Sequence, residues 1–206
     1  MRPIAGRARL AADLFRIGAL RLGRFTLSSG KTSSYYLDLR IVPSHPDVYA
    51  SVVDSYVQKA REIGEDSFTL VAGVATAGVV FASPLALLLK KPLVYVRHEV
   101  KGHGLNRMVE GAVVPGSHAV VVDDLTTTGG SIISAVDSLR KEGCLVSDAL
   151  VLVERLEGGE RNLAKKGVKL WSYTTIRELL DIALRDKMVT KKDYQSVLRQ
   201  LARTSR

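Results

Sequence analysis

Four short apolar runs, each rich in β-branched residues, recur along the middle of the chain. They are Phe68–Ala72, Leu93–Val96, Ala119–Val122 and Ala149–Val153. Unbroken apolar runs of this length are typical of strands buried on both faces, as in a parallel sheet. Between these runs lie two segments whose apolar residues recur at helical spacing, Ala77–Leu89 and Ser131–Glu142. The alternation of strand and helix predicts an α/β fold with right-handed crossovers.

The two ends of the chain carry other patterns. Ala8–Ile17 is predicted to be a short amphipathic helix, and Asp47–Ile63 has apolar residues at roughly helical spacing. In Leu20–Tyr36, two glycines and clustered Ser and Thr break any helix, so we expect a hairpin or short strands. Thr175–Glu178 and Thr190–Asp193 match a capping pattern whose side chains satisfy the N–H groups of a first helical turn. Two late helices should start there.

Length and composition narrow the class of protein. A chain of 206 residues can bury most of the surface that it exposes when unfolded. No internal repeat, low-complexity run or linker is present, so we expect one domain over residues 1–206. No stretch reaches the roughly 20 apolar residues of a membrane span, and we expect a cytoplasmic protein. The single cysteine, Cys144, is expected to be buried and inert.

The net charge of +9 is concentrated at the two ends of the chain. Residues 1–40 contain eight Lys and Arg against two Asp, and residues 185–206 contain seven against two. We interpret these ends as solvated helix faces with a general attraction to polyanions. A surface that binds nucleic acid is the alternative interpretation.

The segment Val120–Ser131 joins an apolar strand to residues that suit a phosphorylated sugar. Asp123 and Asp124 come first, and threonines, glycines and a serine then lead into a predicted helix. In an open α/β sheet, ligands bind at the carboxyl ends of the strands. Glycines let the backbone approach a ligand, and unpaired N–H groups at a helix N-terminus suit a phosphate. The carboxylates can accept hydrogen bonds from a ribose diol and stabilise a cationic transition state.

This run of residues resembles the phosphoribosyl pyrophosphate signature of the type I phosphoribosyltransferases. It matches neither the Walker A motif nor the dinucleotide fingerprint. The resemblance extends over most of the chain and becomes specific to the orotate phosphoribosyltransferases in three further segments. It implies a type I phosphoribosyltransferase fold, in which helices flank a central parallel sheet. An N-terminal hood over residues 1–40, a mobile catalytic loop over residues 97–111 and a basic C-terminal helix over residues 185–206 are expected with it.

The first of these segments, Phe25–Arg40, resembles the N-terminal motif that covers the flat pyrimidine in the orotate enzymes. By that resemblance Tyr35 and Tyr36 lie near the base, and Gly30 and Lys31 lie on its approach. Many members have a lysine where this chain has Ser28. Lys31 is a candidate to take the role of that lysine.

The second segment, Arg97–Gly111, combines cationic side chains with glycines. Lys and Arg stabilise the negative charge that develops on departing pyrophosphate, and a closing lid excludes water. The segment resembles the family's catalytic loop, in which Arg97, Lys101 and His103 match residues that bind pyrophosphate. His98 stands where a second lysine is frequent, and Asn106 replaces a frequent glycine.

The third segment, Val151–Gly159, resembles the strand end at which an arginine receives the carboxylate of orotate. The planar fork of Arg155 suits that carboxylate, and Thr127 is expected to contact orotate beside it. A supporting piece, Gly73–Gly78, resembles the short loop whose backbone N–H groups face the diphosphate. Some members have a lysine where this chain has Ala77.

The resemblance also implies a full set of site residues. Catalysis is assigned to Lys101, His103 and Asp124. Orotate is assigned to Thr127, Arg155, Lys31, Tyr35 and Tyr36. Phosphoribosyl pyrophosphate is assigned to Arg97, His98, Lys101, His103, Asp123, Asp124, Leu125, Thr126, Thr127, Thr128, Gly129, Gly130, Ser131, Thr76, Ala77 and Gly78. Mg²⁺ is the expected cofactor, held mainly through substrate oxygens and water, so no residue is assigned as a direct metal ligand.

The implied reaction displaces pyrophosphate from the ribose by N1 of orotate, giving orotidine 5′-monophosphate. A homodimer that shares its catalytic loop across the interface is expected, without a membrane or nucleic-acid partner. Two alternatives remain at this point. One is a purine phosphoribosyltransferase, and the other is a regulator that senses phosphoribosyl pyrophosphate while its basic termini touch nucleic acid. Association with the decarboxylase of the next step is left open.

Overall fold

The computed structural model describes residues 2–26, 30, 32–97 and 108–204. Within them the chain divides into two compact units. The terminal unit contains Met1–Val52, Arg155–Glu157 and Thr174–Arg206. The sheet unit contains Val53–Glu154 and Gly158–Tyr173.

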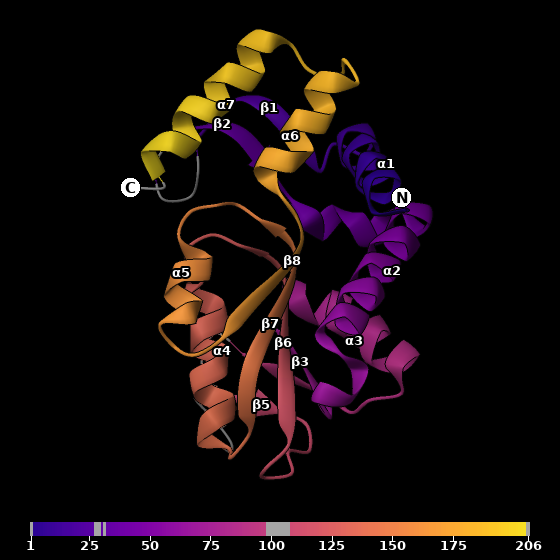
Figure 1. The fold of residues 1–206 in the computed structure, drawn as a ribbon, viewed down its shortest axis with the longest axis vertical. Coiled ribbons are helices and arrows are strands. Elements are labelled where there is room, and N and C mark those ends of the chain that lie inside the picture. The colour runs from indigo at the N-terminus through magenta and orange to yellow at the C-terminus, as the bar shows by residue number, and fades with distance from the viewer. Residues whose placement is uncertain (1, 27–29, 31, 98–107, 205–206) are drawn as a thin grey trace. The chain divides into compact units, whose positions relative to one another are not determined.

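The sheet unit is built on six strands in the order β5-β4-β3-β6-β7-β8 (Figure 1). They are β3 (Leu70–Val74), β4 (Leu93–Val96), β5 (Val109–Glu110), β6 (His118–Thr126), β7 (Leu145–Glu154) and β8 (Lys169–Thr175). The pairs β3–β4, β3–β6 and β6–β7 are parallel, and β5 runs antiparallel to β4. The expected parallel sheet is therefore confirmed.

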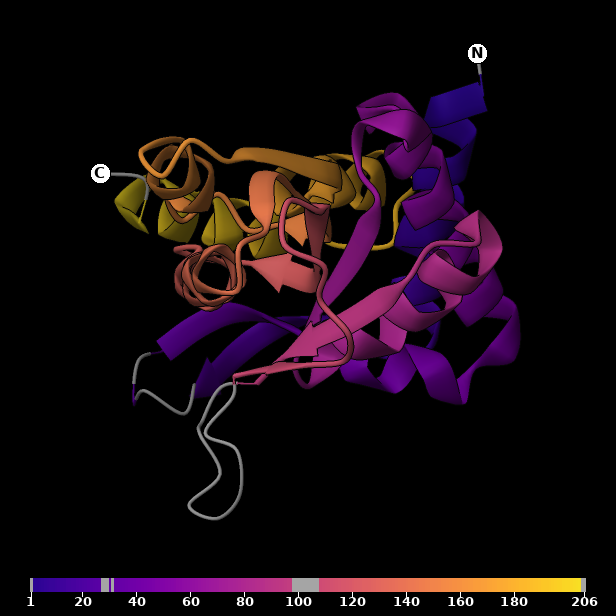
Figure 2. The same cartoon turned by 90° about the horizontal axis from the view of Figure 1, so that it is seen from below.

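Helices cover both faces of this sheet. The connecting helices are α3 (Ala77–Leu89), α4 (Gly130–Lys141) and α5 (Gly159–Ala164), and α2 (Pro46–Ile63) leads into the unit. Figure 1 shows α3 on one face of the strands and α4 with α5 on the other, and Figure 2 shows the sheet end on between them. Apolar residues of α4 pack with Leu70, Ala72, Val121 and Val151 in the main core. Strand residues point alternately to the two faces, so unbroken apolar runs serve both helix layers.

The terminal unit joins the two ends of the sequence. It contains α1 (Arg2–Arg16), the hairpin β1 (Leu20–Thr26) and β2 (Thr32–Leu37), the short helix η1 (Leu39–Ser44), α6 (Ile176–Arg185) and α7 (Lys191–Thr204). The hairpin is antiparallel. Helix α7 packs on the hairpin, and α1 packs on α6 (Figure 1). A salt bridge from Arg7 to Glu178, 2.9 Å long, links these two helices.

The expected elements are all present, with shifted ends. The hairpin lies where Leu20–Tyr36 predicted it, and Thr175 accepts a hydrogen bond from the Glu178 N–H as the capping pattern predicted. Strand β6 is longer than expected, because its pairing with β7 continues to Thr126 and Glu154. Asp123 and Asp124 therefore lie within the strand rather than after it.

Among the described strands and α-helices, β5, β8 and α5 were not predicted. The first has two residues, and α5 has six, too few for a periodic signal. Strand β8 is half-buried at the edge of the sheet and mixes polar with apolar residues, so it shows no unbroken apolar run.

Cys144 is buried as expected. In the described ranges no helix has the length and apolar character needed to cross a membrane.

The helix α3 approaches strand β3 so closely that one strand position has no room for a side chain. A Cβ atom on Gly73 would lie 2.9 Å from Val79 Cα and 3.0 Å from Ala82 Cβ. Such distances are not tolerated, so the strand and the helix would have to separate. Glycine at this position sets the spacing between the sheet and α3.

We expect Gly73→Ala to lower the free energy of unfolding by about 1–3 kcal/mol, because it overpacks this contact. Urea denaturation followed by circular dichroism measures the change. Gly130→Ala is the matched control, since its added Cβ would meet only Thr128 Oγ1, at 3.9 Å. Equal stability of the two variants would contradict the close contact.

Candidate functional site

Two adjacent carboxylates lie at the carboxyl end of β6 in the sheet unit. Asp123 is buried, with 8 % of its surface exposed, and Asp124 is half-buried. The Asp124 N–H donates to Asp123 Oδ1 over 2.9 Å, and the Leu125 N–H donates to Asp124 Oδ1 over 2.8 Å. The Tyr56 hydroxyl of α2 donates to the carbonyl oxygen of Asp123 over 2.8 Å. These bonds fix the backbone that carries both acids.

Burial raises the pKa of Asp123 well above its ordinary value, and the negative charge of Asp124 raises it further. One hydrogen bond from the Asp124 N–H opposes this effect without cancelling it. A carboxyl group that is kept from water beside a second carboxylate favours its neutral form. The pair thus resists carrying two charges until a cationic or hydroxyl-bearing ligand arrives.

The first turn of α3 touches this acid pair directly. A Cβ atom on Gly78 would lie 2.5 Å from the carbonyl oxygen of Val122 and 2.9 Å from Asp123 Oδ1. Only glycine permits this approach. The structure therefore brings Thr76, Ala77 and Gly78, separated from the acids by more than forty positions, to the same strand end.

After the acid pair, the chain continues through a short loop into the N-terminus of α4. Gly129 adopts a left-handed conformation with φ +83° and precedes the first helical residue, Gly130. Thr127 is half-buried, and Thr128 and Ser131 are exposed. The N–H groups of a first helical turn lack partners inside the helix and favour an anion. This loop offers hydroxyl and N–H donors together.

One hydroxyl of this site has no partner among the described residues. Thr126 is buried, with 3 % of its surface exposed, and its Oγ1 makes no hydrogen bond there. A buried polar atom without a partner costs free energy, so a ligand or water at this point would relieve that cost. Its packing against α5 is tight, because a Cβ atom on Gly159 would lie 2.8 Å from Thr126 Oγ1.

The donor set fits a magnesium ion that is shared with a ligand. No group of three or more His, Cys, Asp or Glu that could hold a metal occurs in the described part of the chain. Mg²⁺ is commonly bound by one or two carboxylates together with ligand phosphates and water. Asp123 and Asp124 can supply such a partial set.

In the terminal unit, the structure brings Arg155 into contact with Tyr35 and Glu157. Arg155 Nε–H donates to the Tyr35 hydroxyl over 2.8 Å, and Arg155 Nη2 lies 2.9 Å from Glu157 Oε1. The Arg155 guanidinium also lies over the Tyr35 ring, 4.9 Å from its centroid. Burial raises the pKa of Tyr35 to about 12. The phenol is thus a neutral, fixed support for the guanidinium.

Tyr35 and Tyr36 do not form one platform, because neighbouring residues of a strand point to opposite faces. Tyr35 is buried, whereas Tyr36 is half-buried and packs against Phe25, with ring centroids 5.7 Å apart. Arg21 lies over the Tyr36 ring at 5.1 Å. Each tyrosine therefore belongs to its own cluster.

Arg97 is paired with Glu110, with 3.2 Å between Nη1 and Oε1. The other predicted residues of the catalytic loop, and two of the N-terminal motif, lie outside the described residues. These are His98, Lys101, His103, Asn106, Ser28 and Lys31.

The sequence interpretation missed three residues that shape these sites. The sequence indicates Tyr56 only as one of the apolar residues at helical spacing in Asp47–Ile63, although its hydroxyl anchors the acid pair. Glu157 pairs with Arg155, two positions before it. An acid so near the arginine in the sequence was the signal from which this ion pair could have been predicted. Glu154 is buried at the end of β7, where it pairs in register with Thr126. Burial, and next the charge of Glu160, raises the pKa of Glu154.

Comparison with known proteins identifies the family of the chain. Residues 44–181 match the model of the phosphoribosyl transferase domain family. The chain is 45 % identical to the orotate phosphoribosyltransferase of Sulfolobus acidocaldarius over 86 % of its own length and 88 % of that protein.

Two solved structures are similar over most of the chain. The orotate phosphoribosyltransferase of Aeropyrum pernix is 42 % identical, with a TM-score of 0.76, and the match covers 88 % of this chain and 99 % of that one. The UMP synthase of Leishmania donovani is 30 % identical, with a TM-score of 0.84. That match covers 95 % of this chain and 42 % of the longer protein.

The buried acid leads to a testable dependence of stability on pH. The pKa of Asp123 is higher in the folded state than in the unfolded state, so the folded state binds more protons between the two values. This group therefore lowers the stability as the pH rises above about 4. We expect Asp123→Asn to gain stability relative to the wild type as the pH rises from 4 to 8, in thermal melts without metal.

The matched control is Asp54→Asn, which removes an exposed carboxylate of α2. Its melting temperature should differ from that of the wild type by a nearly constant amount over the same range. A constant difference for Asp123→Asn as well would contradict a raised pKa.

Proposed function

Because the chain belongs to the orotate phosphoribosyltransferases, a family of pyrimidine biosynthesis, we propose that the carboxyl end of β6 is where it binds phosphoribosyl pyrophosphate. The reaction of this family transfers the phosphoribosyl group to N1 of orotate and releases pyrophosphate. The contact of Gly78 with Asp123 carries the proposal. It supports one site in which a diphosphate loop, a carboxylate pair and a phosphate loop serve a single ligand.

The 5′-phosphate is proposed to lie at the N-terminus of α4. The N–H groups and hydroxyls of Leu125–Ser131 supply donors there, and Gly129 allows close approach. The Thr126 hydroxyl, without a partner among the described residues, supports a contact with ligand or ordered water. These residues would hold the ribose in place rather than react with it.

The carboxylates are proposed to act on the ribose. Asp123 and Asp124 would accept hydrogen bonds from its two hydroxyl groups. Their negative charge would also stabilise the positive charge that develops on the sugar as pyrophosphate leaves. Backbone N–H groups of Thr76, Ala77 and Gly78 would face the diphosphate.

Mg²⁺ is proposed as the cofactor, held by substrate oxygens and water with Asp123 and Asp124 nearby. When bound, it would neutralise negative charge on the diphosphate. The chain's own residues position the ribose and the leaving group. Deprotonated orotate is already a nucleophile, so no protein base is required.

Arg155 is proposed to receive the carboxylate of orotate. Tyr35 engages its Nε and Glu157 engages its Nη2, and in the described residues its Nη1 has no partner. Two contacts from one side hold the planar guanidinium in a fixed orientation, which favours recognition of a carboxylate. The assignments of Thr127, Tyr36 and Lys31 to orotate stay predictions from the family resemblance.

The segment 97–111 is proposed to be the catalytic loop, with Lys101 and His103 acting on the departing pyrophosphate. A homodimer that shares this loop is proposed with it, and measurement of the mass in solution tests the dimer. We propose the cytoplasm as the setting, which is compatible with the free thiol of Cys144. The expectation of a single domain stays a prediction.

We expect Lys101→Ala to lower kcat by two orders of magnitude or more while changing the KM values much less, because its charge would be needed in the transition state. Release of pyrophosphate with orotate and Mg²⁺ is measured for the wild type and the variant. Lys191→Ala, an exposed lysine of α7, is the control. Near-normal turnover of Lys101→Ala would remove the loop from the mechanism, whereas no turnover of the wild type would refute the activity itself.

We expect Arg155→Ala to raise the KM for orotate by about 100-fold, in line with the loss of a charge-assisted bidentate contact, and to change the KM for phosphoribosyl pyrophosphate little. The KM for orotate of Arg155→Lys should lie between those of the wild type and of Arg155→Ala, because lysine keeps the charge and loses the planar fork. Arg177→Ala, at an exposed arginine of α6, is the control. Equal effects on the two substrates would refute the assignment of the carboxylate.

A further inference from the structure

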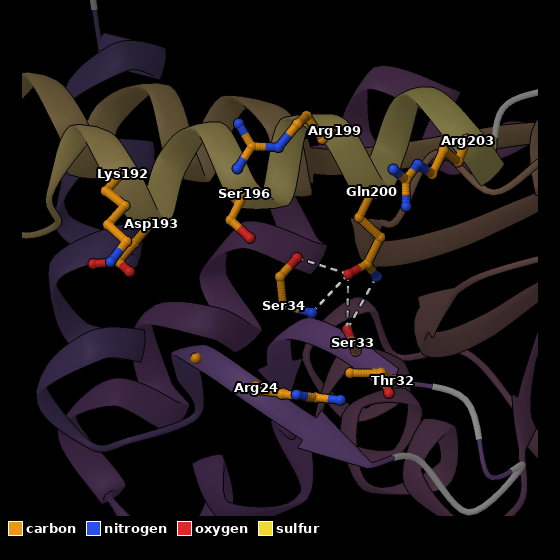
Figure 3. Close-up of a pocket in the computed structure, with 11 residues that line it drawn as sticks. Arg24, Thr32, Ser33, Ser34, Lys192, Asp193, Ser196, Arg199, Gln200 and Arg203 are labelled. Carbon is orange, nitrogen blue, oxygen red and sulfur yellow. Dashed lines mark hydrogen bonds between the residues drawn. The ribbon is translucent and has the colours of Figure 1, made fainter.

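The two basic ends of the sequence meet around a cavity that the proposed reaction does not use. This cavity, of about 640 Å³, lies between α7 and the hairpin β1–β2 in the terminal unit (Figure 3). None of the described residues that line it is among those assigned to orotate or to phosphoribosyl pyrophosphate. Its volume is in the range of sites for small molecules.

Four cationic side chains surround the cavity. Arg24 comes from the basic N-terminal segment, and Lys192, Arg199 and Arg203 come from α7. Within the described ranges, none of the four forms a salt bridge. This differs from the pattern elsewhere in the unit, where arginines such as Arg16, Arg40, Arg177 and Arg185 are paired with a nearby aspartate.

Asp193 is the single acid among the lining residues that the structure describes, and its carboxylate accepts a hydrogen bond at the start of α7. Asp193 Oδ2 accepts a hydrogen bond of 2.6 Å from the Thr190 hydroxyl, and its own N–H donates to Thr190 Oγ1 over 3.1 Å. These two bonds cap the first turn of α7. The lining therefore carries an excess of three positive charges that the described residues do not neutralise locally.

The walls of the cavity are held together by a partly buried polar contact. Gln200 Oε1 accepts hydrogen bonds from the Ser34 N–H, over 2.6 Å, and from the Ser34 hydroxyl, over 2.7 Å. Gln200 Nε2 donates to the buried Ser33 Oγ over 3.0 Å. Figure 3 shows these bonds joining α7 to β2. The contact preforms the cavity before any ligand binds.

Hydroxyl groups complete the lining. Thr32 and Ser196 lie on the two walls, and Figure 3 shows Ser196 and Arg203 projecting from α7 toward the hairpin. Guanidinium groups and hydroxyls are the side chains that bind phosphate oxygens most readily. None of the described lining residues is aromatic, so they offer no ring on which a base would stack.

We propose that this cavity binds a small molecule that carries adjacent phosphates, recognised through its phosphate chain. The excess positive charge matches the several negative charges of such a chain. A described lining without aromatic residues favours this ligand over single-stranded nucleic acid, whose binding relies on stacking. The site would be separate from that of the substrates.

Inorganic tripolyphosphate is the probe, and isothermal titration calorimetry measures its binding to the full chain. We expect Arg199→Gln/Arg203→Gln to weaken one binding event at least tenfold, because two charge-assisted contacts are lost. Arg199→Lys/Arg203→Lys should retain binding to within about threefold, because it keeps both charges. Lys191→Gln, the same loss of charge on an exposed residue of α7 outside the cavity, should bind as the wild type does.

The KM for phosphoribosyl pyrophosphate is measured on the same samples, because it reports the proposed substrate site independently. It should be unchanged in the Gln double variant. Unchanged binding in that variant, an equal loss in Lys191→Gln, or a raised KM would each overturn the proposal. Tighter binding of a single-stranded RNA than of tripolyphosphate, lost in the same variant, would overturn it in favour of a nucleic-acid surface.

Discussion

The rest of the structure depends on the absence of a side chain at two glycines that flank the start of α3. Gly73 lets the helix lie against β3, and Gly78 lets its first turn lie against the end of β6. A Cβ atom at Gly78 would be 2.5 Å from a backbone oxygen, so this contact cannot yield by moving a flexible side chain. The first turn of α3 and the acid pair of β6, distant in sequence, therefore meet at the carboxyl edge of the sheet.

The chemistry of that edge follows from burial. Asp123 is kept from water by the same close approach, and its backbone is fixed by Tyr56. Burial and the neighbouring Asp124 raise its pKa, so a charged pair is costly until a ligand compensates it. A site with this property discriminates in favour of ligands that bring hydroxyl donors or a cation.

In the terminal unit, contacts between residues far apart in sequence determine which cationic groups remain available to a ligand. Arg155 is fixed by Tyr35 and Glu157, which leaves one edge of its guanidinium for a carboxylate. The basic ends, interpreted from the sequence as solvated faces, surround a cavity whose four cations form no salt bridge among the described residues. Both features require segments that are far apart in the sequence, so neither was visible in a local pattern.

The sequence by itself determined the α/β class, the four main strands and the segment Val120–Ser131, because unbroken apolar runs and a strand–acid–glycine order are local signals. It did not determine β8, the extension of β6 through the acids, or the partners Tyr56 and Glu157. Those depend on pairing at a sheet edge and on contacts across large separations in sequence. Only the tertiary structure decided them, because burial and hydrogen-bond partners are set by the packing of the whole chain.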